Sequence, residues 1–124
     1  MKIKKLTDSE LEIMKAIWTA DEPVTIAEIL TLFEERHWKK QTANTFMARL
    51  IDKGLLTVEK RVKTNYYTPL VSEREYQKFE TQNMLKSIHN GSLSSFLSAL
   101  LGDKTDSKDE KEVREWFARF SDDD

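Results

Sequence analysis

The segment KKQTANTFMARLIDKG, residues 39–54, decides the fold because it predicts one short helix with two chemically different sides. Apolar residues recur along it at intervals of three and four, the spacing of a helical stripe that packs on a core: Ala43, Phe46, Met47, Leu50 and Ile51. The opposite side lacks the Glu and Lys pairs of a merely solvated helix and carries small or hydrogen-bonding residues: Gln41, Thr42, Thr45, Ala48 and Arg49. We therefore expect this second side to approach a partner.

Helices on both sides of this segment are marked by capping boxes, in which Ser or Thr precedes Glu by three residues and each satisfies the other's backbone N–H. The pattern occurs ahead of apolar periodic runs at Thr7/Glu10, Thr25/Glu28, Ser72/Glu75 and Ser107/Glu110. Together with apolar periodicity, it predicts a mainly α-helical chain. The predicted helices cover residues 8–20, 26–36, 41–53, 73–89, 93–102 and 108–120.

After residue 54 the pattern changes to LLTVEKRV, then KTN, then YYTP, so β-branched and aromatic residues flank a polar turn. This predicts a β-hairpin with basic residues near its tip. Three helices followed by a basic hairpin is the order of a winged helix-turn-helix, whose third helix enters the major groove. The expected fold class is mainly α with a small β-hairpin: a winged helix-turn-helix DNA-binding domain over residues 1–71, then a helical dimerisation region over 72–124.

Composition narrows the classes of function. The chain has 124 residues, of which 39% are hydrophobic and 34% charged, with no Cys. The size favours one helix-rich folded domain, and the absence of Cys excludes disulfides, zinc fingers and cysteine catalysis. No apolar run approaches the roughly 20 residues of a membrane span, and the N-terminus lacks a signal peptide's apolar stretch. We therefore expect a cytoplasmic protein without a membrane partner.

The net charge of −2 conceals an uneven distribution. Residues 36–63 hold eight basic and two acidic residues, or +6, whereas residues 72–124 hold eight basic and twelve acidic residues, or −4. This asymmetry favours a DNA-facing part joined to a part with another task, the alternative being an accidental cluster of charge. The predicted phosphate contacts, which carry no base identity, are Lys39, Lys40, Lys60, Arg61 and Lys63.

The last third of the chain carries two strongly apolar helical faces, which need a large partner surface. A second copy of the chain, in a two-fold homodimer, is the simplest source of that surface. The alternative is that these helices fold back on residues 1–71 of the same chain. The predicted dimer-interface residues are Tyr76, Phe79, Leu93, Phe96, Leu97, Leu100, Leu101, Val113, Trp116, Phe117 and Phe120.

Four segments together resemble the penicillinase-repressor and copper-transport-repressor family of bacterial regulators. They are LTDSELEIMKAIW at 6–18, VTIAEIL at 24–30, WKKQTANTFMARLIDKGLL at 38–56 and NYYTPLVSEREY at 65–76. The resemblance covers about the first three fifths of the chain at the level of motifs. It implies a cytoplasmic homodimer that binds a short inverted repeat in double-stranded operator DNA and represses a resistance or metal-efflux operon.

The same resemblance implies base contacts from the polar side of the helix over 41–53. Thr42, Thr45 and Arg49 match the family positions that face DNA, while Gln41 stands where relatives often have Lys. Arg suits a guanine edge or a phosphate, Thr can touch a thymine methyl, and Gln can pair with adenine. The alternative is that these are solvated polar positions without a partner.

Two departures from the family leave the inducing signal open. Copper-responsive members carry a cysteine-rich tail, and this chain has no Cys. The β-lactam-responsive members are cleaved at an Asn-Phe bond, whose equivalent falls near Ala99-Leu100, and no Asn-Phe pair occurs in the sequence. Whether a small ligand binds between subunits also stays open.

Other classes of function have less support. A winged helix that contacts an acidic protein is the main alternative to a DNA-binding repressor. An enzyme is not expected, because the sequence has no Gly-rich phosphate loop and no nucleophile elbow. We expect no cofactor and no metal, since His37 and His89 are the only histidines and lie far apart. Four aromatic residues could stack on single-stranded bases, but most of them are expected to pack between the helices and the hairpin instead: Trp18, Trp38, Tyr66 and Tyr67.

Overall fold

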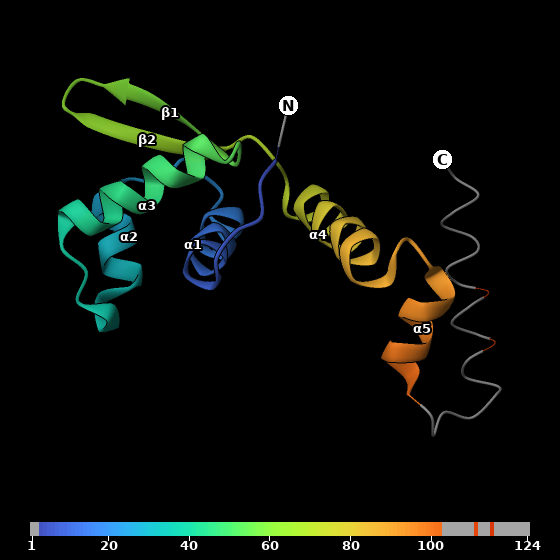
Figure 1. Cartoon of the computed structure of the whole chain (residues 1–124). Coiled ribbons are helices and arrows are strands. Elements are labelled where there is room, and N and C mark those ends of the chain that lie inside the picture. Colours follow the sequence, from blue (N-terminus) through green and yellow to red (C-terminus); the bar gives the residue numbers. More distant parts are fainter. Residues whose placement is uncertain (1–2, 103–110, 112–114, 116–124) are drawn as a thin grey trace. The chain divides into compact units, whose positions relative to one another are not determined.

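The computed structural model describes residues 3–102 together with Lys111 and Glu115. Its elements, labelled in Figure 1 except for η1, are α1 (Asp8–Thr19), α2 (Ile26–Leu32), the 3-10 turn η1 (Glu34–Arg36), α3 (Lys40–Asp52), β1 (Leu56–Arg61), β2 (Thr64–Pro69), α4 (Glu73–His89) and α5 (Leu93–Leu101). The chain divides into two compact units after Glu80, and α4 belongs to both. The expected class, mainly α with one hairpin, is confirmed, and the predicted helix over 108–120 lies almost entirely outside the described residues.

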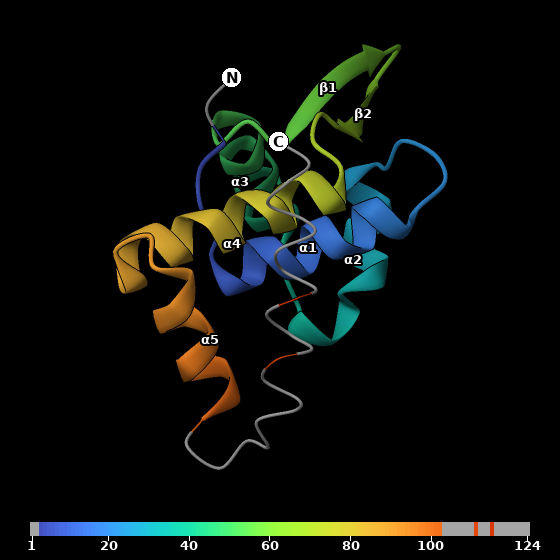
Figure 2. The same ribbon diagram turned by 90° about the vertical axis from the view of Figure 1, so that its right-hand side faces the viewer.

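The core of the first unit is built from one apolar face of each of the first three helices. Its fully buried members include Ile13 and Ile17 of α1, Ile29 of α2 and Met47 of α3. Leu56, at the start of β1, is also buried, which fastens the hairpin to the helices. In Figures 1 and 2 the two strands project beyond the helices of this unit.

Two of the predicted capping boxes form completely. At α1, the Thr7 amide donates to the Glu10 carboxylate at 2.8 Å and the Glu10 amide donates to the Thr7 hydroxyl. Ser72 and Glu75 make the same reciprocal pair before α4. At α2 only half of the box forms, because the Glu28 carboxylate accepts from the Thr25 hydroxyl rather than from its amide. The fourth box lies outside the described residues.

The helix predicted over residues 26–36 is shorter than expected. Regular helix ends at Leu32, a 3-10 turn follows, and His37 takes a left-handed conformation with φ 54°. The reversal stacks Trp38 on Phe33, with ring centroids 5.2 Å apart. Continuing the helix would carry residue 38 away from Phe33, so the aromatic contact accounts for the early end.

The hairpin pairs β1 with β2 in antiparallel register from Leu56↔Pro69 to Arg61↔Thr64, which leaves a two-residue tip at Val62 and Lys63. Tyr67 is 5% exposed and forms a second, isolated bridge with Val24. The hairpin is therefore held at its base by backbone pairing and by core packing, while its tip is free of both.

The start of α4 packs on the core of the first unit. The hydroxyl of Tyr76, which is 3% exposed, accepts from the Leu6 amide at 2.9 Å, and its ring contacts Trp18 and Phe79. The Trp18 indole donates to the Val71 carbonyl at 2.8 Å. Tyr76 and Phe79 thus pack on their own chain, and their predicted place in a dimer interface stays a prediction. The predicted domain boundary at residue 71 precedes this contact, whereas the compact unit continues to Glu80.

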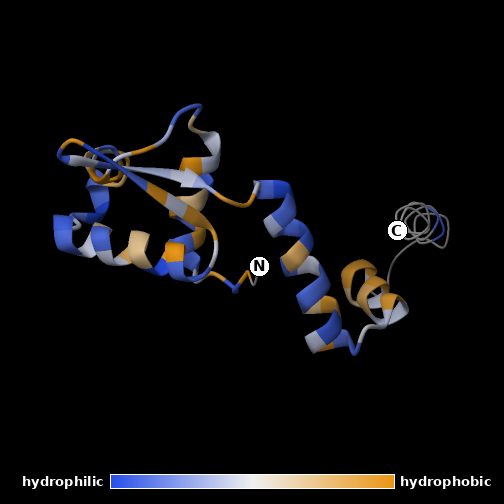
Figure 3. Cartoon of the chain, turned by 90° about the horizontal axis from the view of Figure 1, so that it is seen from above, coloured by the Kyte–Doolittle hydropathy of each residue, from blue (hydrophilic) through white to orange (hydrophobic). Residues whose placement is uncertain are grey.

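The second unit contains the last turns of α4 and the apolar helix α5 (Figure 3). Ser92 caps α5 by accepting from the Ser95 amide at 3.1 Å. Leu97 is buried, while Leu100 on the same helix is 61% exposed. The predicted interface residues Val113, Trp116, Phe117 and Phe120 lie outside the described residues. Within the part of the chain that the structure describes, no helix is both long and apolar enough to span a membrane.

Candidate nucleic-acid interface

Helix α3 is fixed to the protein by the apolar stripe that its sequence predicted. Ala43, Met47 and Leu50 are completely buried, and Phe46 and Ile51 pack against them while partly exposed. The burial of this side against the core leaves the opposite side of α3 accessible to another molecule.

That opposite side is accessible and largely unengaged. Gln41, Thr45 and Arg49 are exposed and Thr42 is half-buried. The Thr45 hydroxyl donates to the Gln41 carbonyl at 3.0 Å, whereas the side chains of Gln41, Thr42 and Arg49 have no hydrogen-bond or ionic partner among the described residues. At 1.5 Å per residue, the stripe from Gln41 to Arg49 is about 12 Å long. Its donors and acceptors suit the edges of bases and phosphate oxygens.

The beginning of α3 is also open. Lys39, at the N-cap position, makes no side-chain capping hydrogen bond, and the first turn contains no acidic residue. No side chain therefore caps the N–H donors of the first amide groups, and no carboxylate of the first turn offsets the positive end of the helix dipole. Trp38 holds this end in place by packing on Phe33 and on Phe46, whose ring centroid is 4.9 Å away.

The far end of α3 is anchored by a charge pair. Lys53 donates to the Glu10 carboxylate at 2.5 Å, and that carboxylate is 1% exposed. The Lys4 amide also donates to the Lys53 carbonyl at 3.1 Å. Lys53 therefore joins the end of α3 to Glu10 in α1 through its side chain and to the segment before α1 through its backbone. Burial alone raises the pKa of Glu10, but the hydrogen bonds from Lys53 and Thr7 outweigh it and hold the pKa below its ordinary value.

The hairpin carries a second charge pair, between Arg61 and Glu59 on β1. The guanidinium donates to the carboxylate at 3.1 Å and lies over the Tyr66 ring at 4.8 Å from its centroid. The bond from Arg61 lowers the pKa of the Glu59 carboxyl, and the carboxylate raises the pKa of Arg61. Lys60 and Lys63 on the same hairpin are exposed and form no ion pair with any described residue.

The structure thus divides the eight basic residues of segment 36–63 into two groups. Three are paired with carboxylates: Arg36 with Glu12, Lys53 with Glu10 and Arg61 with Glu59. The other five have no ionic partner within the described residues, namely Lys39, Lys40, Arg49, Lys60 and Lys63. All five lie on α3, at its N-cap or on the hairpin. The free positive charge is therefore gathered on the elements that a winged helix presents to DNA.

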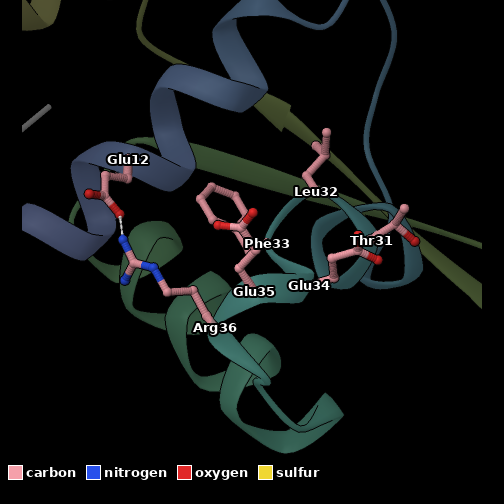
Figure 4. Close-up of a pocket in the computed structure, with 7 residues that line it drawn as sticks. All are labelled: Glu12, Thr31, Leu32, Phe33, Glu34, Glu35 and Arg36. Carbon is pink, nitrogen blue, oxygen red and sulfur yellow. Dashed lines mark hydrogen bonds and ion pairs between the residues drawn. The ribbon is translucent and has the colours of Figure 1, made fainter.

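A cavity of about 380 Å³ lies beside α2 and η1, away from this surface. Its lining includes three carboxylates, and Figure 4 shows Arg36 paired with one of them, Glu12. Among the described residues no group of three or more His, Asp or Glu side chains converges as a metal site.

Sequence reasoning missed Glu10, Lys53 and Glu59. The capping box signalled Glu10 only as a helix start, because its partner Lys53 lies 43 residues away. The alternation of a strand could have found Glu59, since residues two apart on a strand share one face and Arg61 was already a candidate.

Comparisons with known proteins place the sequence among bacterial repressors. A family model described as penicillinase repressor matches residues 6–119. The penicillinase repressor of Bacillus licheniformis is 32% identical over 116 residues, which cover 94% of this chain and 89% of that protein. The methicillin resistance regulatory protein MecI of Mammaliicoccus sciuri is 25% identical over 111 residues, which cover 90% of each protein.

Solved structures give the same fold. The DNA-binding domain of the repressor BlaI matches with a TM-score of 0.53 and 35% identity, covering 61% of this chain and 94% of that one. The monomeric form of Bacillus licheniformis BlaI, solved in complex with the blaP half-operator, matches with a TM-score of 0.50 and 34% identity, covering 60% and 92%. The likeness confirms the winged helix expected from the sequence.

Proposed function

Because the chain belongs to the penicillinase repressor family, we propose that it is a transcriptional repressor that binds double-stranded DNA through α3 and the hairpin. The observation that carries the proposal is the polar side of α3, where Gln41, Thr42 and Arg49 have no partner among the described residues. An exposed Arg without an acidic partner in the described part of the chain, on a segment that also carries unpaired lysines, is suited to a polyanion. The half-operator complex of the similar BlaI supports the same partner.

The roles of the DNA contacts follow from their chemistry. Gln41, Thr42, Thr45 and Arg49 contact base edges in the major groove, because they form the stripe that projects from α3. Lys39, Lys40, Lys60, Arg61 and Lys63 contact phosphates, because they flank that stripe at the N-cap and on the hairpin. The open N-terminal amides of α3 add donors for one more phosphate.

The repressor acts as a homodimer on an inverted repeat. The apolar residues exposed on the second unit, among them Ile88, Leu93 and Leu100, support a contact between chains. A two-fold dimer places two copies of α3 on half-sites about one helical turn apart, and its occupancy excludes polymerase. The regulated operon is of the resistance or metal-efflux type, as the family resemblance implies, with a signal other than copper bound by cysteine.

The test is fluorescence anisotropy of the purified protein with duplex DNA from upstream of its own gene and with a scrambled duplex, at several salt concentrations. We expect a preference of about 1,000-fold or more for the upstream duplex at moderate salt. Equal, weak and steeply salt-dependent binding to both would instead indicate phosphate contacts alone, and no binding would favour the protein-contact alternative.

A further inference from the structure

The hairpin holds one acidic residue among three basic ones. The hairpin sequence from Leu56 to Pro69 contains Glu59, Lys60, Arg61 and Lys63 as its charged residues. Glu59 lies directly opposite Tyr66 in the strand register, and Arg61 follows two positions later on the same face. This face is turned away from the core, because Tyr67, the neighbour of Tyr66, is the buried one.

Arg61 is the only predicted phosphate ligand that is already engaged by another described residue. Its guanidinium donates to Glu59 at 3.1 Å and rests over the Tyr66 ring, while the four lysines of the set have no ionic partner in the described part of the chain. The two side chains are 53% and 66% exposed, so water and ions reach the pair. Exposed pairs of this kind are weak, and a phosphate can replace the carboxylate on the guanidinium.

We propose that Glu59 limits the affinity of the hairpin for DNA by holding Arg61 in a self-paired state that must open before Arg61 binds a phosphate. The inference rests on the proposed function. Tyr66 keeps the guanidinium over its ring while one anion replaces the other. Since phosphates carry no base identity, Glu59 weakens binding to every duplex by the same factor and shortens residence on unrelated DNA.

The test compares Glu59→Gln with the wild-type protein on the upstream duplex and on the scrambled duplex. Release of Arg61 should lower the dissociation constants for both duplexes by about two- to fivefold at low salt, which is the factor that the strength of an exposed ion pair corresponds to. The slope of log K against log salt should steepen by about one unit per hairpin, because the hairpin then meets the phosphates with one more net positive charge. Glu34→Gln is the matched control: it makes the same change in net charge on η1, the teal turn after α2 that lies at the opposite end of the unit from the hairpin in Figure 1.

Repeating the Glu59→Gln change in an Arg61→Ala protein separates two routes by which Glu59 could weaken binding: its ion pair with Arg61, and direct repulsion between its carboxylate and the DNA phosphates. If Glu59 acts through Arg61, Glu59→Gln gives no further gain once Arg61 is absent. An equal gain in that background would overturn the pairing route. Glu59→Gln and the second variant Glu59→Thr, both checked for folding by circular dichroism, would overturn the inference if they bound like the wild type.

The wild-type result keeps the two proposals apart. A wild-type protein that prefers the upstream duplex, with an unchanged Glu59→Gln, contradicts only the role of Glu59. A wild-type protein that binds the upstream and scrambled duplexes equally contradicts sequence-specific repression. The comparison of Glu59→Gln with the wild type on either duplex then still measures the effect of Glu59 on phosphate affinity. Absence of binding to any duplex contradicts both.

Discussion

Lys53, at the end of α3, donates to the buried carboxylate of Glu10 on α1 across 2.5 Å. The same carboxylate closes the capping box that begins α1, so one oxygen joins the start of the first helix to the end of the third. Together with the Trp38 packing at the other end, this pair fixes α3 at both ends. Rigid elements hold a binding surface more precisely than loops do.

Loss of Lys53 should therefore be costly. Lys53→Ala leaves the Glu10 carboxylate buried without its cation, and we expect the free energy of unfolding to fall by about 2–3 kcal/mol. Urea denaturation measures the change. Lys15→Ala, which removes an exposed lysine of α1 that makes no ion pair among the described residues, should change stability by less than about 0.5 kcal/mol. Equal effects of the two substitutions would contradict an anchoring role for Lys53.

The pair also gives stability a pH dependence. The pKa of Glu10 is lower in the folded protein than its ordinary value of 4.5, so the folded state binds fewer protons than the unfolded state in this range. The contribution of Glu10 is therefore complete above about pH 4.5 and is lost as the pH falls through the folded pKa. Denaturation curves between pH 3 and 6 should show a smaller slope for Glu10→Gln than for the wild type, and identical slopes would refute the linkage.

The unpaired lysines should set the salt dependence of DNA binding. Replacing Lys39, Lys40, Lys60 and Lys63 with Ala should reduce the slope of log K against log salt by about one unit for each phosphate that is no longer neutralised. The ratio of affinities for upstream and scrambled duplexes should stay nearly constant, because phosphates are the same in both duplexes. A slope that matches the wild type would remove these lysines from the DNA surface.

The dimer is expected to depend on the exposed apolar residues of the second unit. Leu100→Asp places a charge on a side chain that is 61% exposed, so it should disrupt a contact between chains while leaving each chain folded. Sedimentation velocity should report a shift from dimer to monomer, and operator affinity should fall by at least tenfold. Ala99→Asp, the adjacent exposed position on α5, is the matched control. A Leu100→Asp protein that stays dimeric would contradict this interface.

Local patterns in the sequence predicted the parts of the fold whose causes are local. The two sides of α3, the hairpin and the capping boxes at Thr7 and Ser72 depend on residues a few positions apart, and each was confirmed. Packing of Trp18, Trp38 and Tyr67 was also expected and found.

Features set by distant partners were missed. The early end of α2 depends on Trp38 returning to Phe33, and the role of Tyr76 depends on Leu6, 70 residues before it. Apolar periodicity shows that α4 needs cover but not which surface provides it. The roles of individual α3 residues toward bases stay predictions, because chemistry alone restricts but does not fix their partners.

The central claim is that the polar side of α3 distinguishes bases, and Arg49 offers the most direct measurement. Affinities of the wild type and Arg49→Ala should be measured for upstream duplexes that carry each single base-pair change in turn. We predict that Arg49→Ala costs about 1–3 kcal/mol and loses discrimination at one base pair in each half-site while keeping it elsewhere. A uniform loss at all positions, or no loss, would contradict base recognition by α3.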